Sequence, residues 1–347
     1  MSAPKLSFEE TLLEKVVLKE ICSGCAACVL VCPFGCLEYF EERPNLVKKC
    51  EICGICPRVC PRYDFSQAAL EKLVFEREHK PDEEFGIYRR LVIAQAIDKN
   101  ILRVCQDGGV VTALLTFALE NHIIDGAAVS GLSPEKPLYP IPKLATSRQE
   151  VLECAGTRYT YSPNLLAFRE GIKQKKKNLV YVGTPCQIQA IRRIQMASLK
   201  KYADPLNLTI GLMCTESFDY EGLMKKHIEK EMGISLSDIK KINIKAKLLV
   251  TPKSGEEKII PLKEAKQYTR KSCTLCTDFS AELADISAGG LGMSDWTFTI
   301  LRTKRGEELF KNAEKKGVLR TKPVEDEEGK RALDLLVKLS KRKRETK

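Results

Sequence analysis

The segment KKCEICGICPRVCPRYD, residues 48–64, carries four cysteines spaced two, two and three residues apart, and a proline follows the last of them. A closely similar segment, EICSGCAACVLVCPFGC, occupies residues 20–36. Both copies follow the spacing C-x2-C-x2-C-x3-C-P, which is typical of segments that bind 4Fe-4S clusters. In such a pair the fourth cysteine of each copy binds the cluster of the other copy, so the motif has to occur twice.

We therefore predict two 4Fe-4S clusters that exchange their fourth ligands. The predicted ligands are Cys22, Cys25, Cys28 and Cys60 for the first cluster, and Cys50, Cys53, Cys56 and Cys32 for the second. A pair of structural zinc sites is the alternative, but zinc sites of this kind use two cysteine pairs about 15 to 20 residues apart. The third cysteine of each run would then have no role. Residues 1–82 are thus predicted to form a two-cluster ferredoxin-like domain, in which Cys36 is an additional buried thiol.

Residues 83–347 show a different pattern, in which short apolar runs alternate with amphipathic segments. Strands are expected at 90–97, 125–130, 178–183 and 206–214, helices at 108–122, from about 187 and at 220–233, a hairpin at 247–262, and a lysine-rich helix at the end of the chain. This alternation predicts a larger mixed α/β domain.

A third set of cysteines is distributed over the second domain. The predicted strand in NLVYVGTPCQIQAIRR, residues 178–193, runs into Cys186, and the next strand ends at Cys214. Ligands of α/β sheets bind at the carboxyl ends of strands. Cys273 and Cys276 add a CxxC pair. We predict a third 4Fe-4S cluster bound by these four cysteines; a four-cysteine zinc site fits the spacing too, although two neighbouring electron carriers favour iron.

Several turns of the second domain are suited to a phosphate or a flat ring. In QDGGVVTALL, Asp107 is expected to cap a helix, with Gly108 and Gly109 at its start, where exposed N–H groups favour an anion, although a plain tight turn has the same pattern. In AGTRYTYSPN, Arg158 is suited to a phosphate or carboxylate and Tyr159 to the side of a ring. Glycines at 289, 290 and 292 allow close approach of a ligand, or form a plain loop.

Composition narrows the class of protein. Fifteen cysteines and three histidines make sulfur the expected metal ligand, and clustered thiols in a reducing compartment indicate metal rather than disulfides. The formal charge of +11 falls to about +5 when twelve thiolates and three clusters are included, so no nucleic-acid partner is expected. The tail KLSKRKRETK is either a solvated helix end or a docking patch. No apolar run is long enough to cross a membrane and no secretory signal is evident, which predicts a cytoplasmic protein.

The chain resembles the family of coenzyme F420-reducing hydrogenase beta subunits. The segments that carry the resemblance are GGVVTALL, AGTRYTYSPN, VGTPCQ, MCTES and SCTLCTDFSAELADIS. With the two-cluster domain in front, the arrangement is most similar to the electron-input subunits of F420H2 dehydrogenases, which belong to archaeal respiratory complexes. The resemblance implies that FAD accepts hydride from F420H2 and that electrons then pass singly to the clusters. It also implies the FAD-binding residues Gly108, Gly109, Thr157, Arg158, Tyr159, Gly183 and Thr184.

The resemblance leaves the electron acceptor open. The expected partners are F420H2 and either the other subunits of a membrane-associated electron-transfer complex, at the cytoplasmic face of the membrane, or a ferredoxin-like acceptor. An F420-linked formate dehydrogenase beta subunit and a sulfite reductase-type module are alternatives with the same cofactors. A polyferredoxin-like electron carrier without flavin is the alternative that is not an enzyme.

Overall fold

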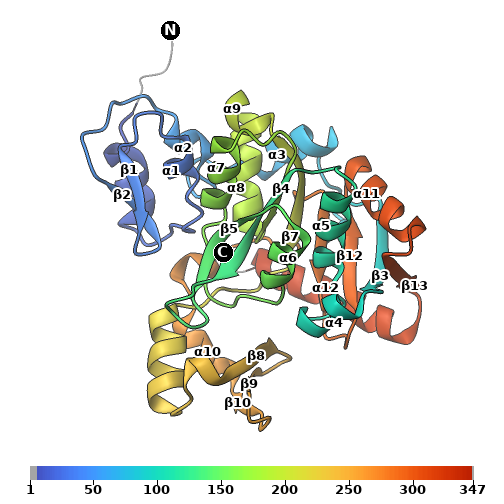
Figure 1. Cartoon of the computed structure of the whole chain (residues 1–347). Coiled ribbons are helices and arrows are strands. Elements are labelled where there is room, and N and C mark those ends of the chain that lie inside the picture. Colours follow the sequence, from blue (N-terminus) through green and yellow to red (C-terminus); the bar gives the residue numbers. More distant parts are fainter. Residues whose placement is uncertain (1–5, 346–347) are drawn as a thin grey trace.

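A mixed sheet of eight strands lies at the centre of the computed structural model, which describes residues 6–345 (Figure 1). The strand order is β13-β3-β12-β11-β7-β6-β4-β5. The strands are β3 (Arg90–Ala96), β4 (Gly126–Leu132), β5 (Pro140–Ala145), β6 (Leu179–Gly183), β7 (Leu206–Leu212), β11 (Ile286–Gly289), β12 (Thr297–Leu301) and β13 (Leu319–Lys322). The four central strands β4, β6, β7 and β11 are parallel, and antiparallel strands extend the sheet on both sides.

The central strands are apolar because helices cover both faces of the sheet. All five residues of β6 are buried, and Val180 pairs with Ala127 of β4 and with Leu208 of β7. Strands that are buried on both sides read as continuous apolar runs rather than as alternating patterns. This explains why these strands were recognisable in the sequence.

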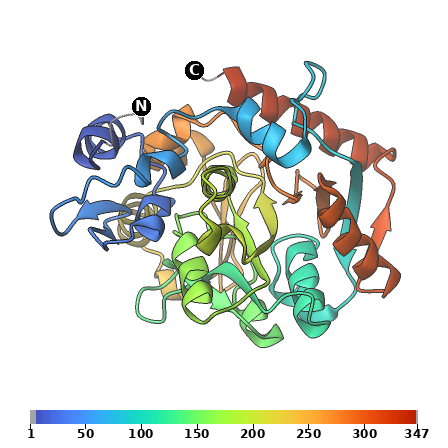
Figure 2. The same cartoon turned by 90° about the horizontal axis from the view of Figure 1, so that it is seen from above.

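Two layers of helices enclose the sheet (Figure 2). One face packs against α4 (Lys99–Val104), α5 (Val110–Glu120), α6 (Arg148–Glu153) and α11 (Lys304–Lys315). The other face packs against α7 (Leu165–Lys173), α8 (Pro185–Met196) and α12 (Glu327–Glu345), and the short helix α9 (Lys200–Ala203) follows α8. The predicted mixed α/β class is therefore confirmed.

The cysteine-rich N-terminal segment lies on the α7–α8 side of the sheet (Figure 1). Its elements are the helix η1 (Glu9–Val17), α1 (Ala27–Val31), the hairpin β1 (Leu37–Phe40) and β2 (Arg43–Leu46), α2 (Cys56–Val59) and α3 (Gln67–Phe75). Its side chains Leu30, Val59 and Leu70 share one apolar core with Ile188 and Ile191 of α8. The predicted boundary near residue 82 separates two segments that pack on each other.

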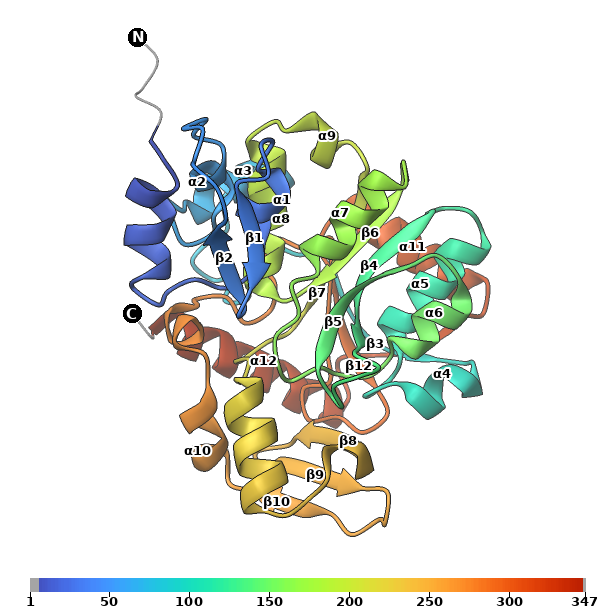
Figure 3. The same cartoon turned by 60° about the vertical axis from the view of Figure 1, so that its left-hand side comes forward.

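Between β7 and β11 the chain leaves the sheet and forms a small satellite unit (Figure 3). It contains the helix η2 (Tyr220–Glu231), the turn η3 (Leu236–Asp238) and a three-stranded sheet of β8 (Ile239–Ile244), β9 (Leu248–Pro252) and β10 (Lys258–Ile260). Then follow α10 (Leu262–Ala265) and the turns η4 (Lys266–Tyr268) and η5 (Lys271–Leu275). The predicted hairpin is therefore present as β9 and β10, and β8 adds a third strand on its other side.

Of the glycines at 289, 290 and 292, Gly289 is the last residue of the parallel strand β11, and the other two follow it outside any strand. One sequence expectation differs from the structure. The N-cap of α5 is Gly109 in a left-handed conformation, not Asp107. Glycine is suited to this position because it has no Cβ atom and adopts the left-handed conformation without steric cost. Within residues 6–345, none of the helices combines the length and the apolar character that a membrane span requires.

Candidate metal centres

The two N-terminal motifs turn their fourth cysteines away from their own helices. Cys28 lies in α1 and Cys56 in α2, whereas Cys32 and Cys60 follow these helices with extended backbone. Each is followed by a proline, which disfavours helical backbone in the preceding residue. The proline therefore redirects the chain, and with it the fourth thiol.

As a result, the structure brings the predicted ligands together in the exchanged arrangement. Burial raises the pKa of Cys28 well above its usual value, and the nearby Cys25, Cys22 and Cys60 thiols raise it further. Burial likewise raises the pKa of Cys56 to about 12, with added effects from Cys53, Cys50 and Cys32. Cys32, Cys50, Cys53 and Cys56 line one cavity, together with Cys36. Cys36 is buried beside this set and donates to the Lys49 carbonyl oxygen at 3.2 Å.

A second cavity is lined by the four cysteines of the third set, Cys186, Cys214, Cys273 and Cys276. Cys186 lies in the first turn of α8, directly after β6, and Cys214 lies just after the parallel strand β7. Both therefore leave the sheet at the carboxyl ends of adjacent strands. Burial raises the pKa of Cys186 to about 11, and the Cys276 thiol contributes. Thiols with raised pKa stay protonated unless a metal takes the place of the proton.

Three cations surround the third set. The Arg270 guanidinium is neutralised by the Glu42 carboxylate at 2.6 Å and lies over the Tyr161 ring at 4.5 Å. Arg62 and Lys343 also line the cavity, and neither has a carboxylate partner within the described part of the chain. A buried cation without a counter-charge is strongly destabilising. The cavity is therefore suited to an anionic group, as four thiolates around a metal centre are.

The third set is suited to a cluster by its donor atoms and by the groups around it. Between residues 6 and 345, no three or more cysteine, histidine, aspartate or glutamate side chains are grouped in a way that would hold a metal ion. In a four-iron cluster each of four thiolates binds its own iron. The donor atoms, their burial and the uncompensated cations thus fit a cluster.

Sequence reasoning missed Arg62 and Lys343. Arg62 follows Cys60 and Pro61 directly, and this adjacency to a predicted ligand was the available signal. Lys343 belongs to the tail that was interpreted as solvated or as a docking patch, yet it is only 9% exposed and donates to the Cys273 carbonyl oxygen at 3.2 Å. Within the tail, Lys343 is therefore not solvated, whereas Lys341, Arg342 and Glu345 around it are exposed, as a solvated helix end or a docking patch would be.

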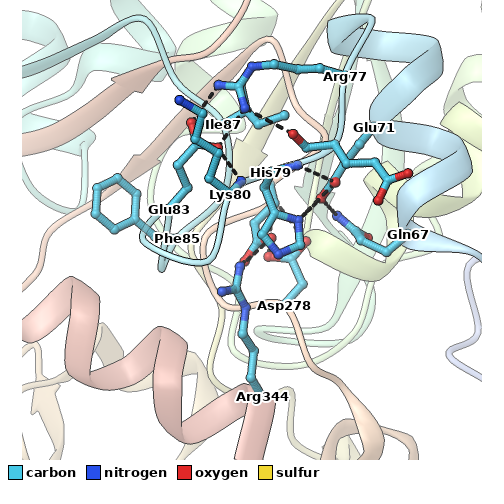
Figure 4. A network of polar contacts seen from close by, with 12 residues as sticks. Gln67, Glu71, Arg77, His79, Lys80, Glu83, Phe85, Ile87, Asp278 and Arg344 are labelled. Atoms are coloured by element: carbon cyan, nitrogen blue, oxygen red, sulfur yellow. Dashed lines mark hydrogen bonds and ion pairs between the residues drawn. The ribbon is translucent and has the colours of Figure 1, made fainter.

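Arg344, the residue after Lys343, makes a further contact between α12 and the chain around the third cysteine set. Arg344 donates to the buried Glu282 carboxylate at 2.8 Å. Figure 4 shows Arg344 extending from α12 toward the segment that carries Asp278, close to the contact between His79 and Glu71. That segment follows Cys276 directly, so α12 is held against the chain that carries the third cysteine set.

The predicted FAD-binding residues fall into two groups. Gly183 and Thr184 adjoin the third cysteine set: Thr184 caps α8, and its hydroxyl oxygen lies 3.4 Å from the Cys186 sulfur. The other group lies near the satellite unit, where Asp107 is close enough to Tyr159 to add to the effect of burial in raising the pKa of Tyr159. Residues 158–162 connect the two groups, because Tyr161 lines the cavity of the third cysteine set.

In the second group, contacts within the protein account for some of the residues but not for others. A Cβ atom on Gly108 would lie 2.6 Å from the Ala94 carbonyl oxygen, so packing on β3 alone requires glycine there. Thr157 is exposed. Arg158 donates to the Ala155 carbonyl oxygen at 3.1 Å, but its buried Nε has no hydrogen-bond partner in the described structure. A buried unpaired donor of this kind fits a bound anionic or carbonyl group.

Comparisons with known proteins relate the chain to a family. Residues 91–169 and 176–327 match the family described as coenzyme F420 hydrogenase/dehydrogenase, beta subunit, by its N-terminal and C-terminal parts respectively. The coenzyme F420 hydrogenase subunit beta of Methanococcus voltae is 40% identical over 264 residues, which are 75% of this chain and 93% of the relative. A subunit of the F420H2 dehydrogenase of Methanosarcina mazei is 30% identical over 348 residues, covering 96% of this chain and 92% of the relative.

A solved structure shows the same fold. A chain of the F420-reducing [NiFe] hydrogenase complex from Methanosarcina barkeri superposes with a TM-score of 0.72 at 36% identity, over 77% of this chain and 92% of that chain. The match to the dehydrogenase of Methanosarcina mazei, which leaves only a small part of this chain uncovered, must include most of the N-terminal cysteine segment. The family matches, in contrast, begin at residue 91.

Proposed function

The chain belongs to the family of coenzyme F420 hydrogenase/dehydrogenase beta subunits, as its sequence predicted, and on this premise we propose that it is the electron-input subunit of an F420H2 dehydrogenase. In this proposal it oxidises F420H2 and passes electrons one at a time to a partner complex of an archaeal respiratory chain. Named relatives are F420-dependent oxidoreductase subunits, which supports a redox function of this kind.

The grouping of twelve cysteines into three sets of four supports the proposal most directly. We propose that the first cluster is held by Cys22, Cys25, Cys28 and Cys60, the second by Cys50, Cys53, Cys56 and Cys32, and the third by Cys186, Cys214, Cys273 and Cys276. Bound FAD supplies hydride acceptance and the clusters supply one-electron transfer, which F420H2 itself cannot carry out readily.

The arrangement of the sets supports a route through the molecule. The Tyr161 side chain lies within electrostatic reach of Cys186 of the third set and Cys25 of the first set. The first set in turn adjoins Cys56 of the second set. The second set lies at the surface, where Phe34 and Ile52 beside it are about half exposed. Electrons would thus enter at the third set and leave through the second, where a partner subunit has access.

The residues of this chain have positioning roles in the reaction. Arg158 offers its buried Nε to the flavin, and Tyr159 flanks the same region. Gly183 and Thr184 place the flavin site next to the third cysteine set. Hydride transfer requires above all that the ring systems of F420H2 and of FAD are held face to face with water excluded. A position at the cytoplasmic face of the membrane, beside the partner complex, forms part of the proposal.

Cofactor content and activity of the anaerobically purified chain test the proposal. We expect about 12 iron atoms, about 12 acid-labile sulfides and about one FAD per chain. The isolated chain should oxidise F420H2 when an artificial electron acceptor is supplied. Well-folded protein that holds iron but no flavin would instead identify an electron carrier, and zinc in place of iron would refute the proposal.

A further inference from the structure

Two cations from opposite ends of the sequence meet at the third cysteine set. Arg62 comes from the N-terminal segment and Lys343 from the last turn of α12, yet both line the cavity that holds Cys186, Cys214 and Cys273. Arg270, the third cation of this cavity, differs because Glu42 neutralises it. Arg62 and Lys343 thus bring two uncompensated positive charges to this cavity.

The backbone that positions Cys60 also positions Arg62. Cys60 has extended backbone before Pro61 and points toward the first cysteine set, so that Arg62 turns toward the third. Its two Nη atoms donate to the carbonyl oxygens of Ser272 at 3.4 Å and Leu275 at 3.5 Å. Its Nε is buried and has no hydrogen-bond partner within residues 6–345. The guanidinium therefore sits between the two cysteine sets.

Lys343 occupies a position that would ordinarily be apolar. The buried residues of α12 are Gly329, Ala332, Leu336, Ser340 and Lys343, which form one stripe at helical spacing. A lysine at the end of such a stripe has to face the interior. Here its ammonium group reaches the Cys273 carbonyl oxygen.

Together the two cations cover all four thiols. Arg62 lies near the thiols of Cys276 and Cys186. Lys343 lies near those of Cys214 and Cys273. Four thiolates outweigh the positive charge of an iron–sulfide core, so the filled site is anionic and becomes more so by one unit when it accepts an electron. A fixed positive charge at this distance stabilises the reduced form more than the oxidised form.

We propose that Arg62 and Lys343 are positioning residues that hold positive charge on both sides of the third cluster and thereby raise its reduction potential. This inference rests on the proposed function, because it requires a cluster at the third set. In the proposed function FAD would accept both electrons of F420H2 as hydride, and a cluster at the third set would receive them one after the other and pass each to the first cluster, while the protons go to solvent. The raised potential favours electron flow from the coenzyme into the chain of clusters.

Redox titration of the anaerobic full-length protein, followed by electron paramagnetic resonance, tests the inference. The signal of the third cluster is identified by its absence from Cys214→Ala. We expect Arg62→Gln and Lys343→Gln each to move the midpoint of this signal to a more negative potential, and the double variant to move it further. The charge-conserving variants Arg62→Lys and Lys343→Arg should stay near the wild-type midpoint.

Matched controls are available on the same two segments. Arg58 is exposed and donates to the Ala197 carbonyl oxygen, and Lys341 pairs with Glu84. Neither residue lines the cavity of the third cysteine set. Arg58→Gln and Lys341→Gln should leave the midpoint unchanged. A shift of equal size in these controls would overturn the inference, since any loss of positive charge would then have the same effect.

The remaining outcomes also decide the question. An unchanged midpoint in a double glutamine variant that retains the signal would refute the inference. If the glutamine variants fail to assemble the cluster, assembly with a wild-type midpoint in the charge-conserving variants supports it, and failure there as well refutes it. Wild-type protein with roughly 8 iron atoms and no signal that depends on Cys214 would refute the third cluster itself, and so the proposed function.

Discussion

Iron content of paired cysteine variants tests the exchange of fourth ligands. The structure groups Cys60 with Cys22, Cys25 and Cys28, although its own motif contains Cys50. The double variant Cys22→Ala/Cys60→Ala should therefore disrupt a single cluster and retain about 8 of about 12 iron atoms. The double variant Cys50→Ala/Cys60→Ala should disrupt two clusters and retain about 4.

The two doubles remove equal numbers of thiols, so a general loss of folding would affect both alike. Iron and acid-labile sulfide are measured per chain after anaerobic purification, and circular dichroism checks the fold. Cys36→Ala is the control with full iron content, because Cys36 is a buried hydrogen-bond donor outside both sets. The reverse order, with about 4 iron atoms in the Cys22/Cys60 double and about 8 in the Cys50/Cys60 double, would refute the exchanged arrangement.

Three further predictions concern stability. Arg193→Ala should cost about 2–4 kcal/mol in urea unfolding and open residues 57–64 to protease, because its guanidinium donates to three carbonyl oxygens there; equal protease resistance would contradict this. Asp285→Asn should cost about 3–5 kcal/mol, since the buried Arg192 loses the carboxylate that lies 2.9 Å from its guanidinium. An unchanged melting temperature would contradict this cost. Gly108→Ala should cost about 1–3 kcal/mol and lower the flavin content, because the new methyl group meets the backbone of β3 and β12. Wild-type stability together with wild-type flavin content would show that these strands shift to make room for the methyl group.

The fold was predictable where packing left a local trace in the sequence. The strands β3, β4, β6 and β7 are buried on both faces and appear as apolar runs. In contrast, β5 contains two prolines and β8 two lysines, as edge strands commonly do. Residues 286–289 consist mainly of small side chains and become a strand because β7 and β12 lie on either side of them.

The site was predictable to a similar extent. For the two N-terminal motifs, spacing and proline predict which cysteines belong together, and this stays a prediction, whereas the family resemblance is confirmed by the comparisons. For the cations around the third set, the only signal in the sequence was the position of Arg62 directly after Cys60 and Pro61, because Arg62 and Lys343 are far apart in the chain and share no motif. The left-handed start of α5 at Gly109 was also misjudged, since a neighbouring aspartate is the usual cap.

The sequence by itself was enough to predict the ligand chemistry proposed for this protein, because a CxxC turn or a cysteine before proline constrains only the nearest few residues of the chain. Only the tertiary structure decided which charges surround each set of thiols. That surrounding comes from the order of strands in the sheet and from the packing of α12 and the N-terminal segment on it, which are contacts between residues far apart in sequence.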